Sequence, residues 1–68
     1  LKEGDFAKLI FCVGNEPSER IWVILTDCTD TMAWKGKTDN DPVGLQTAKV
    51  LPAGSEVTFH PLDIIATE

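Results

Sequence analysis

The chain has 68 residues, with eleven Asp and Glu residues against six Lys and Arg residues, and a net charge of −5. This balance argues against nucleic-acid binding, which depends on cationic contacts with phosphates, and favours an encounter with a basic partner. No apolar stretch reaches the roughly 20 residues that cross a bilayer. We therefore expect one small, soluble, cytoplasmic domain over residues 1–68 that does not bind membranes.

The first half of the sequence predicts two strands joined by a polar turn. An apolar run over Phe6–Val13 is interrupted by turn residues at Gly14–Ser18. The next run, Arg20–Cys28, is apolar on both of its alternating faces, which favours a central strand with Trp22 in the core. The polar connection between the two runs suits an antiparallel hairpin.

The middle of the sequence predicts a third strand and then an ambiguous segment. Residues Asp30–Thr38 alternate in the manner of a half-buried strand, with Met32 and Trp34 on one face. Residues Val43–Leu51 fit either an extended segment or a short helical turn. The β-branched residues and the glycine of this segment favour the extended form.

The C-terminal part predicts a turn, a strand and a final short turn. Pro52 is expected at the second position of a type I turn and Gly54 at the fourth. Residues Glu56–His60 alternate as a strand, and a 3₁₀ turn over Leu62–Ile65 is expected to tuck its first and last residues against the core. Short strands with frequent turns indicate an all-β fold, a small four- to five-stranded SH3-like barrel with a short C-terminal 3₁₀ turn.

The two cysteines, Cys12 and Cys28, are too few for a disulfide scaffold or a zinc site. Both lie in apolar runs, where free cysteine behaves as a small hydrophobic residue. We expect buried free thiols; a Cys12–Cys28 disulfide is the alternative. No metal or cofactor is expected.

The segment Asp39-Asn40-Asp41-Pro42 invites a chemical interpretation, and calcium is the first candidate. If Asp39 takes position one of an EF-hand loop, Gly44 falls at the sixth position, where that loop requires glycine. The match then fails, because Val50 stands where a carboxylate should close the site. A catalytic carboxylate pair is the second candidate, but no motif supplies a nucleophile, and the single histidine, His60, lies at a strand end.

Two further interpretations of this segment need no chemistry. Asp and Asn side chains bond to the nearby backbone, and Pro42 favours extended geometry before it, so the segment can simply turn the chain. It can also form a partner-binding surface. If the hairpins pair as predicted, four carboxylates gather at one end of the barrel near Trp34, an aromatic anchor inside an acidic rim; they belong to Asp27, Asp30, Asp39 and Asp41.

In its order of motifs the sequence resembles the small bacterial YegJ-like family, a domain of unknown function related to immunity-protein-like domains. The resemblance is carried by the stretches GDFAKLIF, ERIWV, WKGKTDNDPV and GSEVTFHPLDI, which together cover nearly the whole chain. It implies a protein that binds a partner and performs no chemistry. The chain departs from the family pattern between Gly44 and Leu51, and it lacks the long N-terminal portion of many members, so it is expected to be the C-terminal part of a longer protein.

The sequence therefore predicts a non-catalytic protein-interaction module, in its sharpest form an immunity or inhibitor protein that binds a basic, toxin-like partner. Two alternatives remain open: a small-ligand-binding or hydrolytic domain that uses the Asp39 and Asp41 carboxylates, and a structural domain of a larger protein. The predicted partner-binding residues are Trp34, Lys35, Lys37, Asp39, Asn40 and Asp41.

Overall fold

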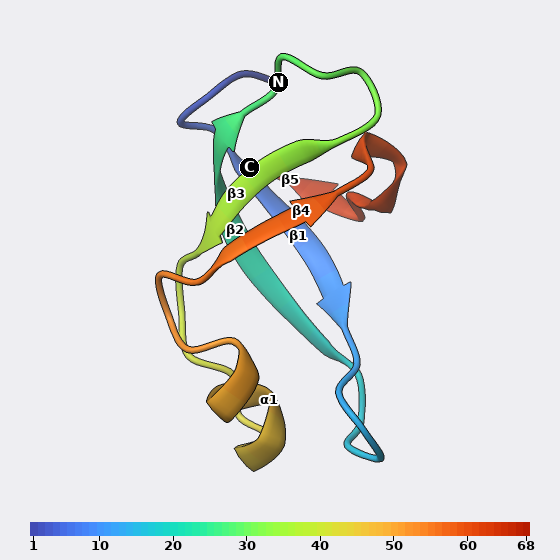
Figure 1. Cartoon of the computed structure of the whole chain (residues 1–68), viewed down its shortest axis with the longest axis vertical. Helices are drawn as coiled ribbons and strands as arrows, with labels where there is room; N and C mark the ends of the chain where they lie inside the picture. The colour runs from blue at the N-terminus through green and yellow to red at the C-terminus, as the bar shows by residue number, and fades with distance from the viewer.

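The computed structural model describes all residues of the chain, 1–68, as a single twisted antiparallel sheet with very little helix (Figure 1). The elements follow one another as β1 (Phe6–Phe11), β2 (Glu19–Asp27), β3 (Trp34–Thr38), α1 (Leu45–Val50), β4 (Glu56–Phe59), the 3₁₀ turn η1 (Pro61–Asp63) and β5 (Ala66–Thr67). The predicted strands are thus present, although the third begins only at Trp34 instead of Asp30, and the C-terminal 3₁₀ turn spans Pro61–Asp63 instead of Leu62–Ile65. The segment Val43–Leu51 was expected to be extended, and this was wrong, because most of it forms α1.

The five strands lie in the order β4-β3-β2-β1-β5, and every neighbouring pair is antiparallel. No pairing joins β4 to β5, so the sheet is not closed. The molecule is elongated, with extents of 32 × 19 × 19 Å. In Figure 1 the β1–β2 hairpin end and α1 extend from the sheet as two arms on the same side.

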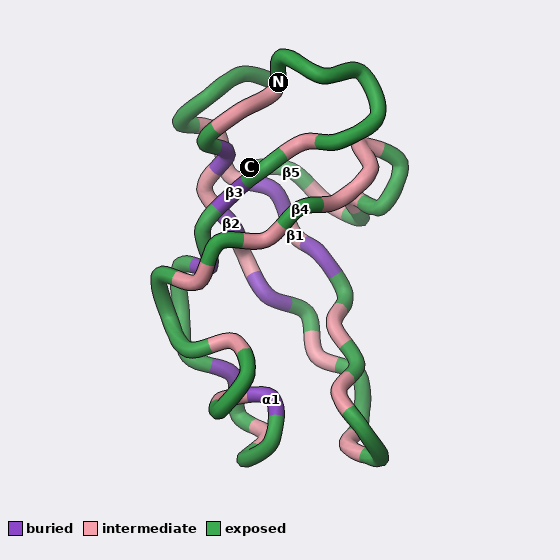
Figure 2. Tube along the Cα trace, in the orientation of Figure 1, coloured by how far each residue is buried: buried purple, intermediate pink, exposed green.

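The core lies on one face of the sheet, as the period-two alternation of the strands dictates. Register pairs Ala7 with Val23 and Leu9 with Ile21, and all four side chains are buried (Figure 2). Leu25 extends this layer toward β3, where it faces Gly36. The aromatic side chains that pack around this layer are only half-buried; they are Phe11, Trp34 and Phe59.

Three side chains do not lie where the sequence predicted them. Met32 was expected on the same strand face as Trp34, but it lies in the β2–β3 loop and is 68% exposed. Leu62 and Ile65 were expected to tuck against the core but are 87% and 45% exposed, whereas Ile64 packs there instead. The reason is that η1 ends at Asp63, so the chain is extended again at Ile64 and turns that side chain inward.

The turn before β4 has a different geometry from the one predicted. The amide of Ser55 donates to the carbonyl of Pro52 over 3.1 Å, so Pro52 is the first residue of the turn and Gly54 the third. Gly54 has a φ of 86°, as the third position of a type II turn requires. The buried hydroxyl of Thr38 fixes this turn to the sheet by donating to the Pro52 carbonyl over 3.0 Å.

Candidate functional site

The structure separates the six predicted partner-binding residues into two groups at opposite ends of β3. Trp34 begins the strand, pairs with Phe59 of β4 and packs half-buried against the core. Asp39, Asn40 and Asp41 follow the last residue of the strand and are exposed. Five residues of extended chain span roughly 17 Å, so Trp34 does not anchor the acidic segment. Lys35 and Lys37 lie between the two groups, exposed on the face opposite the core.

The four carboxylates that were expected near Trp34 do not form one cluster either. Asp27 and Asp30 lie at the beginning of β3, because Asp27 pairs with Lys35 and Asp30 is in the β2–β3 loop. Asp39 and Asp41 lie at the other end of the same strand. The arrangement is therefore two acidic pairs along one strand rather than a single acidic rim.

Most of these carboxylates accept hydrogen bonds from nearby backbone groups. Asp30 Oδ1 accepts from the amides of Met32 and Ala33, and Asp41 Oδ1 accepts from the amide of Ala53 over 2.8 Å. Asp27 accepts from both the amide and the hydroxyl of Thr29, and these bonds lower the pKa of its carboxyl, with Lys35 adding a smaller electrostatic contribution. The local bonding that the structural interpretation predicted for the Asp39–Pro42 segment is not what Asp41 makes, because its carboxylate binds the amide of Ala53, 12 residues further along the chain.

Asp39 is the exception, because no hydrogen bond to its carboxylate is formed while its backbone amide donates to the carbonyl of Trp22 over 2.9 Å. This bond places Asp39 next to Trp22 of the neighbouring strand β2. The aromatic residue beside the acidic segment is therefore Trp22, which was expected in the core, and not Trp34. The alternation of β2 indicated this position, because Trp22 lies on the opposite face of the strand from buried Ile21 and Val23.

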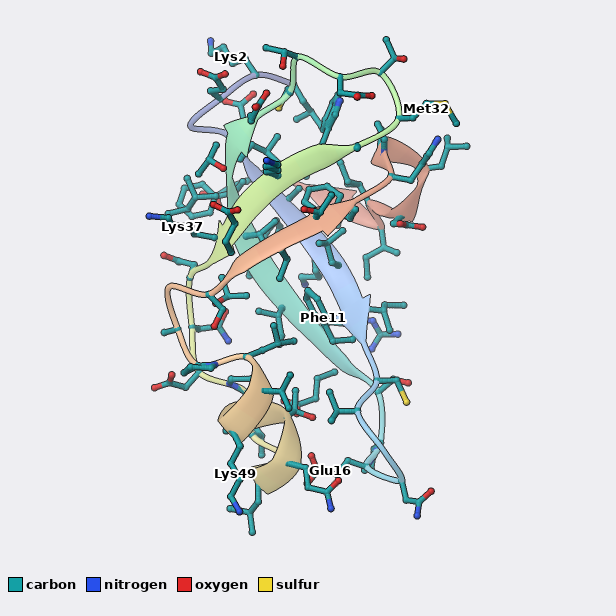
Figure 3. The ribbon with its side chains drawn as sticks, in the orientation of Figure 1. Lys2, Phe11, Glu16, Met32, Lys37 and Lys49 are labelled. Atoms are coloured by element: carbon teal, nitrogen blue, oxygen red, sulfur yellow. The ribbon has the colours of Figure 1, made fainter.

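Trp22 lies at the centre of a surface that we call the convex patch, on the face of the sheet opposite the core. Lys8 is its cross-strand partner on β1, and the Lys8 ammonium nitrogen sits 4.7 Å from the centroid of the Trp22 ring. Such a distance is that of a cation–π contact. The convex patch consists of Lys8, Ile10, Arg20, Trp22, Ile24 and Lys37. In Figure 3 the Lys37 side chain projects outward from the sheet.

A second arrangement that the sequence did not reveal holds α1 in place. Glu19 Oε1 accepts from the amide of Val43, and its Oε2 accepts from the amide of Gly44 over 2.9 Å. Glu16 Oε2 accepts from the amide of Gln46, and its Oε1 accepts from both the amide and the hydroxyl of Thr47. Figure 3 shows Glu16 beside the helix.

These two glutamates replace an ordinary helix cap. Gly44 is the N-cap residue and has no side chain to accept the first amides of the helix, which would otherwise lack partners. The carboxylates of the β1–β2 hairpin bind those amides from across the molecule, where the positive end of the helix dipole favours negative charge. The same backbone bonds lower the pKa of Glu16, those from Thr47 and Gln46 contributing most. Two of the eleven acidic residues are thus structural.

The hollows of the surface do not coincide with the acidic segment. The largest is an open groove of about 490 Å³ between β1, β4, η1 and the residue before β5, with a mainly apolar lining that includes Ile10, Phe11, Phe59 and Ile65. Neither Asp39 nor Asp41 lines any of the three hollows. No group of three or more His, Cys, Asp and Glu side chains is placed to hold a metal ion.

Both cysteines are free thiols, as expected, but they are not both buried. Cys28 is half-buried and packs against the core, whereas Cys12 is exposed, because it lies just beyond the end of β1. Burial raises the pKa of the Cys28 thiol, and the nearby carboxylates of Glu3 and Asp27 add to this effect.

Comparison with models of known families, with curated proteins and with solved structures gives no match. The resemblance to the YegJ-like family therefore stays a prediction. No helix in the structure combines the length and the apolar character needed to cross a membrane.

Proposed function

We propose that this domain is a non-catalytic protein-interaction module built on an open SH3-like sheet. The strand order β4-β3-β2-β1-β5, with a 3₁₀ turn directly before the last strand, supports the SH3-like description. The observation that carries the function is the position of Trp22. A tryptophan that lies on the outer face of the sheet, with Lys8, Arg20 and Lys37 around it, has the composition of an interaction hot spot.

The hydrolytic alternative has less support. The Asp41 carboxylate is bound to the amide of Ala53, and neither Asp39 nor Asp41 lines any of the hollows of the surface. The imidazole of His60 is occupied as well, since its Nδ1 accepts from the amide of Leu62 over 3.0 Å. A general acid or base needs a group free to reach the substrate's proton, and these groups are not arranged around a common site.

The immunity or inhibitor form of the proposal, with a basic partner, depends on Asp39. Asp39 is exposed, its carboxylate accepts no hydrogen bond, and the residue lies next to Trp22 of the neighbouring strand. The net charge of −5 favours the approach of a basic partner over a long range. Asn40 is exposed next to it and would extend the contact.

A second candidate function, that of a structural domain in a larger protein, is favoured by the apolar groove. Ile10, Leu62 and Ile65 line the groove and are 50%, 87% and 45% exposed. An apolar surface of this kind commonly marks a contact with another segment or domain.

Affinity capture from a lysate of the source cells tests the proposed function. The tagged domain is compared with a Trp22→Ala variant and with Leu45→Ala, which removes an exposed apolar side chain from α1, away from the convex patch. We expect one stoichiometric protein to be retained by the wild type and by Leu45→Ala, and lost by Trp22→Ala. Retention of the same protein by all three would refute a function centred on Trp22. Asp39→Lys, compared with Glu3→Lys, then decides whether the partner is basic.

A further inference from the structure

The turn that joins β4 to β5 is capped by a histidine. His60 directly precedes η1, and its Nδ1 accepts a hydrogen bond from the amide of Leu62 over 3.0 Å. Asp63 Oδ2 in turn accepts from the amide of His60 over 3.1 Å, so the two side chains form a reciprocal capping box. The residues usual at this position are Asp, Asn, Ser and Thr, whose oxygen atoms stay acceptors between about pH 5 and pH 8.

The protonation state of a histidine cap decides whether the cap forms. In the neutral imidazole one ring nitrogen donates and the other accepts, whereas in the imidazolium ion both nitrogens donate. The bond from the Leu62 amide therefore requires a neutral His60 ring with its hydrogen on Nε2. Histidine is the side chain that changes charge between about pH 5 and pH 8. His60 is only half-buried, so a proton from solvent reaches the ring and removes the cap.

The capped turn forms one wall of the apolar groove. Leu62 and Asp63 line the groove from η1, together with Ile10 and Phe11 of β1. Leu62 is 87% exposed, so no packing against the core holds its side chain in this position. Its place on the groove wall therefore depends on the conformation of the turn.

Contacts on both sides of the turn keep its ends in place. Before the turn β4 pairs with β3, and after it Ile64 packs on the core while the amide of Ile65 donates to the carbonyl of Lys8 over 2.9 Å. Within the turn the amides of Asp63 and Ile64 donate to backbone carbonyls, but the Leu62 amide donates to the imidazole. Loss of the cap is therefore expected to change the turn and to leave the sheet intact.

We propose that His60 is a proton-sensitive switch that sets the conformation of η1 and, through it, the shape of the apolar groove. With a neutral imidazole the capping box is closed and Leu62 stays on the groove wall. With a protonated imidazole Nδ1 donates, the Leu62 amide loses its acceptor, and the Asp63 carboxylate offers the ring an acceptor within the same box. The switch does not involve the convex patch, so this inference and the proposed function can each fail alone.

The charged groups around His60 act in both directions. The Asp63 carboxylate, on the turn itself, favours the imidazolium ion. Of the segments beside β4, the β2–β3 loop contributes Asp30, which acts in the same sense, and β3 contributes Lys35, which opposes it. Across the groove β1 supplies only apolar lining residues, and its one cation, Lys8, is held in the cation–π contact on the outer face.

An NMR titration of the isotopically labelled domain between about pH 8 and pH 5 tests this proposal. The ring signals of His60 give the midpoint of its protonation directly, because the chain has no other histidine. We expect the protection of the Leu62 amide against hydrogen exchange to fall about fivefold with that midpoint, as the loss of an N-cap predicts. The methyl signals of Leu62 and Ile65 should shift with the same midpoint, while the amide of Val23 in the central strand keeps its protection.

Two variants separate the switch from other effects of pH. His60→Asn is the matched control, because an asparagine oxygen caps the turn without titrating, and we expect the Leu62 amide to stay protected throughout. His60→Ala should leave this amide unprotected throughout. The proposal is overturned if wild-type protection of Leu62 does not follow the His60 ring, if His60→Asn shows the same transition, or if His60→Ala stays protected. Unchanged methyl signals of Leu62 and Ile65 would overturn the effect on the groove. Capture through Trp22 tests the proposed function separately.

Discussion

Replacement of Gly36 by alanine tests how closely β2 and β3 are packed. Gly36 is buried in β3 between Leu25 and Val57. A Cβ atom at this position would lie 2.9 Å from the carbonyl oxygen of Ile24 and 3.4 Å from the Val23 side chain. The Ile24 carbonyl belongs to the backbone of the central strand, so it cannot move aside as a flexible side chain would.

The magnitude follows from two opposing effects. Overpacking of a core costs about 1–3 kcal/mol, while the loss of glycine's freedom in the unfolded chain returns about 0.4–1 kcal/mol. We expect Gly36→Ala to lower the free energy of unfolding by about 1–2 kcal/mol, which is a large share of the ~3–5 kcal/mol that a core of this size supplies. The expected fall in Tm is roughly 5–15 °C.

Urea denaturation followed by tryptophan fluorescence, together with thermal melting by circular dichroism, measures the effect. Lys35→Ala is the matched control, because Lys35 neighbours Gly36 on the same strand but is exposed, and its loss should change stability by less than about 0.5 kcal/mol. If Gly36→Ala matched this control or exceeded wild-type stability, the close approach of β3 to β2 would be refuted.

Three other measurements address the site and its surroundings. Trp34→Ala should destabilise the domain by about 2–3 kcal/mol, and more than Trp22→Ala, because Trp34 packs on the core; equal losses in urea denaturation would contradict this. The pKa of Glu16 lies below its ordinary value of 4.5 in the folded state, so Glu16 stabilises the fold above about pH 4.5, and this contribution is lost as the pH falls through the lowered pKa. Glu16→Gln should therefore reduce the loss of unfolding free energy at acid pH and speed amide hydrogen exchange at Gln46 and Thr47, and Glu3→Gln is the control. An unchanged dependence of the unfolding free energy on pH would rule out the Glu16 cap. Cys12 should react with a thiol reagent at mildly alkaline pH faster than Cys28, because burial raises the pKa of Cys28. Mass spectrometry of the Cys12→Ser and Cys28→Ser variants measures the two reaction rates, and a faster reaction at Cys28 would contradict this prediction.

The placement of α1 shows where sequence patterns lose their predictive value. Its six residues have no periodicity long enough to predict a helix, and its N-cap is a glycine without a side-chain acceptor. The helix depends on Glu16 and Glu19, which are 31 and 25 residues away from Thr47 and Gly44 in the chain. A cap supplied over such a distance leaves no local signal.

The two tryptophans show the same limit in the candidate site. Trp22 lies in a strand with apolar residues on both faces, so composition alone does not show which face is covered. The register decides it: Trp22 pairs with Lys8 on the convex side, and Trp34 pairs with Phe59 on the core side. The alternation of Trp22 with Ile21 and Val23 was visible in the sequence, but its meaning required knowledge of the buried face.

Local sequence by itself determined where most of the strands lie and that they pair as antiparallel hairpins, because alternation and turn residues act over a few positions, but it did not determine the type of the turn before β4. Only the tertiary structure decided which aromatic residue lies beside Asp39 and which carboxylates bind backbone amides. Those properties depend on strand register and on contacts between distant residues, and a shift of one residue in register would exchange the two faces of the sheet.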